Sequence, residues 1–218
     1  HMGVPAHRAF LKKLGLLDPV ATELGPSAAP IVPKRWKKLN TMTIAFGHGL
    51  SVTPLQLATA TVPLVNGGLA VPPTFLPRTR EEALAVSTRV LKSGTSSAVV
   101  KLMRENVLRG SGKRANAEGY RVGGKTGTAE KVVNGRYARH SLLNSFLSVF
   151  PTDDPQYVVL VTLDEPQRVE ATNYNSTAGV NAAPTVGKVV ARIAPILGVP
   201  PKLGETASRF DAKRSATY

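Results

Sequence analysis

The segment 121–131, which reads R-V-G-G-K-T-G-T-A-E-K, most constrains how this chain folds. Glycines and threonines stand where an ordinary strand carries Val or Ile, and a strand keeps glycines where another group approaches its backbone closely. Lys125 supplies a cation, and Thr126 and Thr128 supply hydroxyl donors. The residues after Gly127 add backbone N–H groups, so the set suits a carboxylate or a developing oxyanion. The segment predicts a strand with a ligand along its edge; the alternative is a glycine-rich surface turn that holds a lysine.

The composition indicates a globular chain without a metal centre. Its 218 residues, 42% of them hydrophobic, suffice for one large domain or slightly more, at about 150 residues a domain. The chain has no cysteine, and its four histidines lack metal-ligand spacing, so we expect no metal and no other cofactor. No apolar run approaches the ~18 residues of a membrane span. The first two residues, His1-Met2, resemble the remnant of a cleaved expression tag, which places the natural start elsewhere.

The net charge of +14 indicates an anionic partner. Small basic clusters occur at 12–13, 34–38 and 113–114, but aromatic residues make up only 6% of the chain and do not interleave with them. No nucleic-acid-binding motif is present, so we expect no nucleic-acid partner. Anionic lipid headgroups or an acidic polymer suit the charge equally well.

The segment 53–65 predicts a helix with a well-defined start. Thr53 suits the N-cap, Pro54 the first helical position and Gln56 the third position of a capping box. Pro63 lacks the N–H that a helix interior needs, so a kink or an early end is expected there. The residues expected on the buried face are Leu55, Ala58, Val62 and Val65.

Three further segments carry the apolar periodicity of helices, and two short apolar runs indicate strands in addition to 121–131. The helices are expected at 4–14, 93–110 and 184–197, and the strands at 121–131, 143–150 and 157–163. The last two strands form a hairpin, with 121–131 paired beside the first of them, so the fold class is α+β. Asp153 and Asp154 lie in the Pro-flanked hairpin turn and are interpreted as turn formers rather than as paired catalytic carboxylates. The residues expected on the apolar faces of the helices 93–110 and 184–197 are Val99, Leu102, Met103, Val107, Val186, Val189, Val190 and Ile193.

Several separated motifs together resemble the class B penicillin-binding proteins. They are A-F-G-H-G-L-S-V-T-P-L-Q-L-A at 45–58, N-G-G at 66–68, G-K-T-G-T-A-E at 124–130 and A-A-P at 182–184. The sequence of residues 46–57 is most similar to that of the division-specific (septal) transpeptidase. The resemblance runs from about Phe10 to Leu197.

The resemblance implies a partial penicillin-binding protein/serine β-lactamase-like fold, with about three antiparallel strands and packed helices. Residues 3–199 would be the C-terminal part of the transpeptidase domain, and 200–218 a mobile tail. The family's chemistry needs S-x-x-K, S-x-N and K-T-G, and only the third motif is present. The nucleophilic serine is therefore expected in an N-terminal part of the domain that this chain lacks, and the chain alone is expected to be inactive. The sheet edge facing that part would be open, which predicts dimerisation, element swapping or marginal stability.

The resemblance also implies the site and its partners. The intact protein would cross-link peptidoglycan stem peptides, and β-lactam antibiotics would trap its acyl-enzyme. Lys125 would provide positive potential, Thr126 and Thr128 would hold the substrate carboxylate beside Gly127, and the Thr128 N–H would form half of the oxyanion hole. Further partners would be divisome membrane proteins and the missing part of the domain. The location would be the periplasmic face of the bacterial inner membrane, with the anchor outside this chain.

Other interpretations remain open on the sequence. The chain could be a non-catalytic scaffold or binding fragment, or, less in keeping with its motifs, a basic nucleic-acid-binding module. His48 is either catalytic or a packed or solvated residue, and its lack of an obvious partner favours the latter. The segment 173–179 either lines the substrate cleft that the resemblance implies or is a connecting loop without a functional role.

Overall fold

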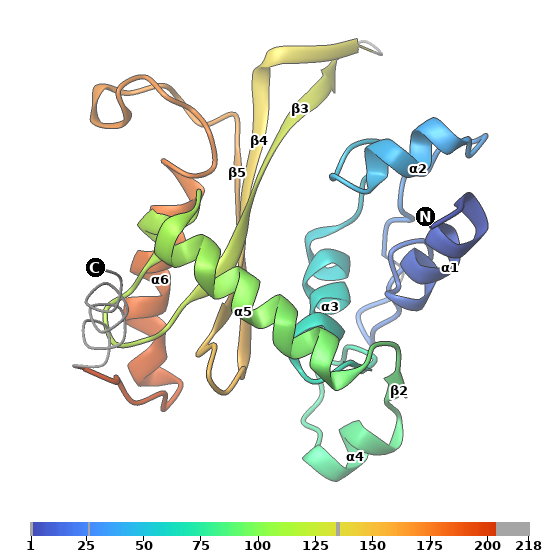
Figure 1. The fold of residues 1–218 in the computed structure, drawn as a ribbon, viewed down its shortest axis with the longest axis horizontal. Helices are drawn as coiled ribbons and strands as arrows, with labels where there is room; N and C mark the ends of the chain where they lie inside the picture. Colours follow the sequence, from blue (N-terminus) through green and yellow to red (C-terminus); the bar gives the residue numbers. More distant parts are fainter. Residues whose placement is uncertain (1, 26, 134–135, 204–218) are drawn as a thin grey trace, which may run out of the picture. The chain divides into compact units, whose positions relative to one another are not determined.

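The computed structural model describes residues 2–25, 27–133 and 136–203 (Figure 1). The chain divides into two compact units, of which the first runs to Lys101 and includes Val158–Leu160, and the second comprises the remainder. Among the described residues, no helix combines the length and apolar character needed to cross a membrane. The predicted α+β class is confirmed, because helices accompany a three-stranded antiparallel sheet.

The first unit is mainly helical, with one small two-stranded sheet in which β1 and β2 pair antiparallel. Its first helix ends as predicted, with Leu14 as the C-cap. Between Leu14 and α2, the described residues form no helix or strand, and Ile31 makes an isolated bridge to Ser51. The elements are α1 (Val4–Lys13), α2 (Lys38–Ile44), α3 (Pro54–Val65), β1 (Leu69–Ala70), α4 (Arg80–Ala85), β2 (Thr88–Arg89) and the first part of α5 (Ser93–Arg109).

Helix α3 begins as predicted, and its buried face matches the prediction in part: Val65 is buried, whereas Ala58 and Val62 are half-buried. Thr53 Oγ1 accepts a hydrogen bond from the Gln56 N–H at 3.2 Å, which confirms the cap. Leu55, predicted inward, is 37% exposed, whereas Gln56 is 1% exposed. The Gln56 amide is buried because it donates to the Gly15 and Asp18 carbonyls at 2.7 and 2.8 Å, which ties α3 to the end of α1. The helix runs through Pro63 to Val65, and its buried residues are Gln56, Ala60, Thr61, Pro63 and Val65.

Two short helices, α2 and α4, were not predicted. Helix α4 begins with a reciprocal capping box in which the Glu82 N–H donates to Thr79 Oγ1 and the Thr79 N–H donates to Glu82 Oε2. That T-x-x-E signal was present in the sequence and could have located the helix. Helix α2 lacks such a signal, because its N-cap is Lys37, whose N–H donates to Asn40 Oδ1 at 2.8 Å.

The second unit contains the larger sheet, in which β4 lies between β3 and β5 (Figure 1). The predicted pairing of β3 beside β4 is confirmed; the strands are antiparallel, with Lys125 opposite Leu147 and Gly127 opposite Ser145. Helix α6 packs against β4. The elements are β3 (Gly123–Val133), β4 (Arg136–Phe150), β5 (Tyr157–Asp164), α6 (Ala182–Ile196) and the single-turn helices η1 (Lys113–Ala115) and η2 (Glu170–Thr172).

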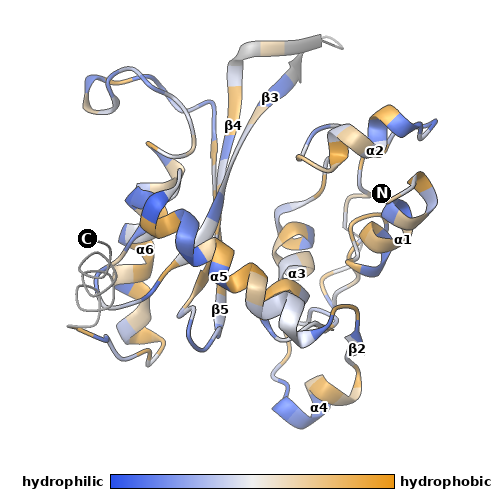
Figure 2. Ribbon diagram, viewed as in Figure 1, coloured by the Kyte–Doolittle hydropathy of each residue, from blue (hydrophilic) through white to orange (hydrophobic). Residues whose placement is uncertain are grey.

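The core of this unit lies between β4, α6 and the second part of α5. Apolar and polar residues alternate around both helices in Figure 2. Met103 and Val107 of α5 are buried as predicted, but Leu102 is 69% exposed. The prediction for Leu102 is wrong because it lies about 100° around the helix from Met103, off the stripe that includes Val107. Residues with no exposed surface include Val122, Phe146, Val149, Phe150, Ala182, Ala183, Val186, Val190 and Ala194.

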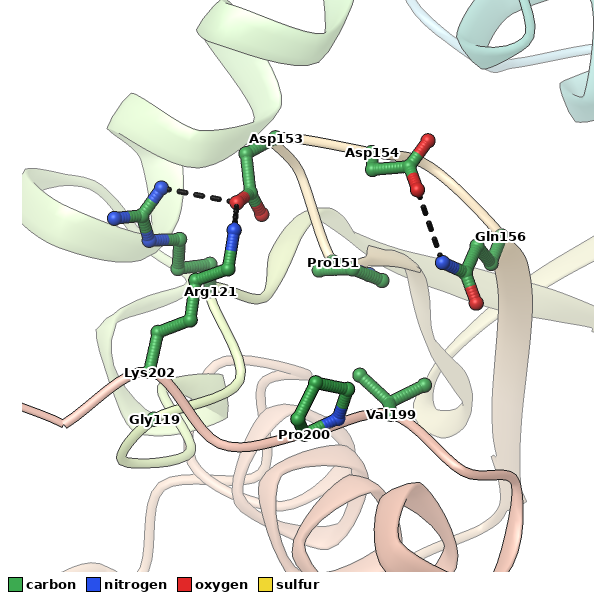
Figure 3. A pocket seen from close by; sticks show the side chains of 9 residues that line it. All are labelled: Gly119, Arg121, Pro151, Asp153, Asp154, Gln156, Val199, Pro200 and Lys202. Atoms are coloured by element: carbon green, nitrogen blue, oxygen red, sulfur yellow. Dashed lines mark hydrogen bonds and ion pairs between the residues drawn. The ribbon is translucent and has the colours of Figure 1, made fainter.

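After α6 the chain passes the loop that leads into β3. The Lys202 N–H donates to the Gly119 carbonyl at 2.9 Å, and both Lys202 Nζ and Arg121 bind the Asp153 carboxylate (Figure 3). Partial burial alone acts to raise the pKa of Asp153, but the hydrogen bond from Lys202 and the charge of Arg121 hold it below its ordinary value. These contacts surround a cavity of about 230 Å³. The predicted mobile tail lies mostly outside the described residues, which end at Leu203.

Candidate functional site

The predicted site residues lie along β3, an outer strand of the described sheet. Side chains alternate between the two faces of a strand, so Lys125 and Thr126 point to opposite faces, with Gly127 on the Lys125 face and Thr128 on the Thr126 face. The Lys125 side chain and the two threonine side chains therefore meet only along the edge of β3 that faces away from β4. A ligand along that edge has access to side chains of both faces and to outward backbone N–H groups.

Lys125 supplies an exposed cation beside this edge. Its Nζ donates to the carbonyl oxygen of Thr126 at 2.7 Å, which holds the ammonium group against its own strand. Hydrogen bonds to an exposed ammonium exchange readily with water or with a ligand anion, because a surface contact of this kind contributes little net energy. Lys125 makes no ion pair with another described residue, so its ammonium group is placed to attract an anion.

The two threonines are held by loops distant in sequence. Thr128 Oγ1 accepts a hydrogen bond from the Ala178 N–H at 3.0 Å, across 50 residues of chain. Thr126 Oγ1 lies 2.8 Å from Ser111 Oγ, in the loop that follows α5. The structure therefore brings Ser111 and Ala178 to the site, although neither of them carries a sequence signal that connects it with the threonines. Ala178 belongs to the segment 173–179, so one residue of that segment does lie beside β3.

The glycines of β3 stand in two different environments. A Cβ on Gly124 would lie 2.4 Å from the ring of Phe146, and one on Gly123 would lie 2.7 Å from Thr152. These glycines therefore permit close packing within the protein. A Cβ on Gly127 would have no neighbour nearer than 3.9 Å. The interpretation that the glycines mark an approaching ligand is wrong for Gly123 and Gly124, and only Gly127 leaves space for one.

Lys131, which follows Thr128 at the spacing of an S-x-x-K motif, is directed elsewhere. Its Nζ donates to Asp164 and Glu165 at 2.9 Å each, at the end of β5. These hydrogen bonds raise the pKa of Lys131 above its ordinary value. Because both carboxylates bind the Lys131 ammonium group, this lysine is engaged at the end of β5 rather than directed at Thr128 as its base.

The other candidates of the sequence analysis do not belong to β3. His48 is exposed in the first unit, outside any helix or strand. Asp153 and Asp154 occupy the turn after β4 as predicted, and Asp153 also takes part in the ion pairs with Arg121 and Lys202. In the part of the chain that the structure describes, no group of three His, Asp or Glu residues is placed to hold a metal ion.

Comparison with known proteins gives a consistent family assignment. A family model of the penicillin binding protein transpeptidase domain matches residues 1–191. A Caulobacter vibrioides protein named "Probable peptidoglycan D,D-transpeptidase FtsI" is 42% identical over 202 residues, 87% of this chain and 34% of that protein. Stage V sporulation protein D of Bacillus subtilis is 34% identical over 177 residues, 77% of this chain and 27% of that protein.

A solved structure shares the fold. The transpeptidase domain of Burkholderia pseudomallei penicillin-binding protein 3 has a TM-score of 0.81 at 29% identity, and the match covers 93% of this chain and 60% of that one. The present chain thus spans about a third of the length of the Caulobacter relative and somewhat less of the Bacillus relative.

Proposed function

Because this chain belongs to the penicillin-binding protein transpeptidase family, we propose that residues 3–199 are the C-terminal part of a D,D-transpeptidase domain that cross-links peptidoglycan. The observation that carries the proposal is the edge strand β3, which presents a cation, two hydroxyls and an open glycine in succession. The 42% identity to an FtsI-type relative and the motif at 46–57 support a role in cell division. The intact protein would act at the periplasmic face of the inner membrane, with divisome membrane proteins as partners.

The chemistry is acyl transfer through a serine supplied by another part of the domain. The serine oxygen adds to the carbonyl carbon of the penultimate D-alanine, and the carbonyl oxygen becomes an oxyanion. When this intermediate collapses, the C–N bond breaks and the proton lost by the serine hydroxyl passes to the nitrogen, so the terminal D-alanine leaves as a free amine. The amine of an acceptor stem peptide then attacks the acyl-enzyme and releases the serine. A β-lactam enters the same first step but leaves a stable acyl-enzyme.

The residues of β3 bind and polarise the substrate in this scheme. Lys125 attracts the terminal carboxylate of the donor peptide, and the hydroxyls of Thr126 and Thr128 donate hydrogen bonds to it. The Thr128 N–H donates to the oxyanion, and loss of one such donor typically costs about 3–4 kcal/mol of transition-state stabilisation. Gly127 leaves the space in which the substrate backbone lies against the strand.

Penicillin labelling tests the proposal. Intact mass spectrometry is expected to show a stoichiometric adduct on the full-length protein and none on the 218-residue chain. In the full-length protein, Lys125→Ala is expected to slow acylation by about a hundredfold, the scale of one transition-state electrostatic contact. Lys131→Ala, a matched change on the same strand, is expected to leave the rate nearly unchanged. A serine adduct within 3–199 would refute the assignment of the nucleophile, and failure of both proteins to react would favour a non-catalytic scaffold.

A further inference from the structure

The hydroxyls of Thr126 and Thr128 each contact a group from a different loop of the second unit. Thr128 Oγ1 accepts from the Ala178 N–H at 3.0 Å, and Thr126 Oγ1 lies 2.8 Å from Ser111 Oγ. An amide N–H is only a donor, so Thr128 keeps its own hydrogen for a second partner. The contact between Thr126 and Ser111 has two possible directions, and the direction decides whether Thr126 is able to donate to a ligand.

The loop that carries Ser111 is closely packed against its surroundings. A Cβ on Gly112 would lie 3.1 Å from the buried ring of Phe146, and one on Gly179 would lie 2.8 Å from the Ser111 carbonyl oxygen. Because these approaches leave no room for a side chain, the loop is held in one position next to β3. The backbone therefore presents Ser111 Oγ to Thr126 at a fixed place.

Asn106, in the last turns of α5, limits where the Ser111 hydrogen goes. Its Nδ2 donates to the Gly124 carbonyl at 2.8 Å, which orients the amide so that Oδ1 accepts a hydrogen bond from Ser111 Oγ at 3.3 Å. Ser111 has one hydrogen and two acceptors, Asn106 Oδ1 and the closer Thr126 Oγ1. A carboxylate at the edge of β3 is an anionic acceptor that attracts the hydrogen of Thr126, and this leaves a lone pair of Thr126 for Ser111.

We propose that Ser111 is a positioning residue: its O–H donates to Thr126 Oγ1 and thereby directs the Thr126 hydrogen toward a ligand carboxylate at the outer edge of β3. The inference rests on the proposed function, in which Thr126 holds that carboxylate. Ser111 acts through Thr126 and does not contact the ligand. The Ala178 N–H has the same role for Thr128, because it donates to Thr128 Oγ1 and leaves the Thr128 hydrogen available for the ligand.

The test compares acylation of the full-length protein by a penicillin and by the methyl ester of the same penicillin. The ratio of the two second-order rate constants measures recognition of the carboxylate, and a general structural defect lowers both rates together. Ser111→Ala is expected to lower this ratio by about tenfold. A loss of this size corresponds to a weakened hydrogen bond between the Thr126 hydroxyl and the charged carboxylate. Ser111→Thr keeps the hydroxyl and is expected to restore the ratio. Ser97→Ala, which removes an exposed serine hydrogen bond elsewhere on α5, is the matched control.

The outcomes separate this inference from the proposed function. Thr126→Val is expected to lower the ratio at least as much as Ser111→Ala. If Thr126→Val leaves the ratio unchanged, Thr126 does not bind the ligand carboxylate, and the proposed role of Ser111 is refuted as well. If Thr126→Val lowers the ratio but Ser111→Ala does not, only the role of Ser111 is refuted. Equal losses for penicillin and its ester in Ser111→Ala would also refute it.

Discussion

A single methyl group at Gly124 tests whether packing within the protein explains the glycines of β3. In Gly124→Ala, the new Cβ would lie 2.4 Å from a ring carbon of Phe146 and 2.6 Å from the Leu147 carbonyl oxygen. Non-bonded carbon atoms prefer separations of about 3.5–4.0 Å. The ring has no exposed surface, and the carbonyl belongs to the neighbouring strand, so neither is able to move away easily.

The expected cost follows from these contacts. Overpacking of a well-filled core typically costs about 1–3 kcal/mol. A displaced β3 also weakens the hydrogen bond from Asn106 Nδ2 to the Gly124 carbonyl, worth about 1 kcal/mol. We therefore expect Gly124→Ala to lower the free energy of unfolding by about 3 kcal/mol. For a domain of this size, that loss lowers Tm by about 6–12 °C.

Gly127→Ala is the matched control, because it makes the same change on the same strand. Its Cβ would have no neighbour nearer than 3.9 Å, and the backbone there lies outside the left-handed region. The variant is expected to be as stable as the original chain, or up to about 1 kcal/mol more stable, since alanine loses less backbone entropy than glycine. Thermal unfolding followed by circular dichroism measures both variants. Equal stability of Gly124→Ala and Gly127→Ala would refute the packing explanation.

The ion pairs of Asp153 and those of Lys131 give opposite dependences of stability on pH. The pKa of Asp153 is lowered in the folded state, so its contribution to stability is present above its ordinary pKa of 3.8 and is lost as the pH falls through the folded pKa. Asp153→Asn should therefore be less stable than the original chain at pH 7 and equal to it near pH 2, and a constant difference in urea unfolding would contradict this. The pKa of Lys131 is raised in the folded state, so its contribution is present below 10.5 and is lost as the pH rises through the folded pKa. The difference in Tm between Lys131→Met and the original chain should be small at pH 7 and should vanish at strongly alkaline pH; a difference that grew with pH would exclude the ion pairs as its source.

Much of the fold could be predicted from local patterns. The helices α1, α3, α5 and α6 follow from apolar periodicity and end signals that act within a few residues. Strand β3 follows from its glycine-containing motif, and its partner β4 from a short apolar run. Short elements with weak periodicity, such as α2, could not be recognised in this way. The inward face of α3 was predicted only in part, because burial of Gln56 depends on the Gly15 and Asp18 carbonyls, which lie about 40 positions earlier.

The candidate site was predicted in part. The line of groups on β3 follows from the spacing of the motif, since neighbouring residues of a strand keep a fixed separation. The partners of those groups did not follow, because Ser111 and Ala178 carry no motif that points to Thr126 or Thr128. Their contacts join residues 15 and 50 positions apart.

The sequence by itself determined which chemical groups stand together on β3 and to which family they point. Tertiary structure alone decided that Gly124 accommodates Phe146 whereas Gly127 leaves open space. It also decided that Lys131 is tied to the acidic end of β5, and that Thr128 receives the Ala178 N–H. The physical reason is that dihedral preferences and side-chain spacing act between neighbours, whereas close packing and hydrogen-bond direction depend on segments that only the fold brings together.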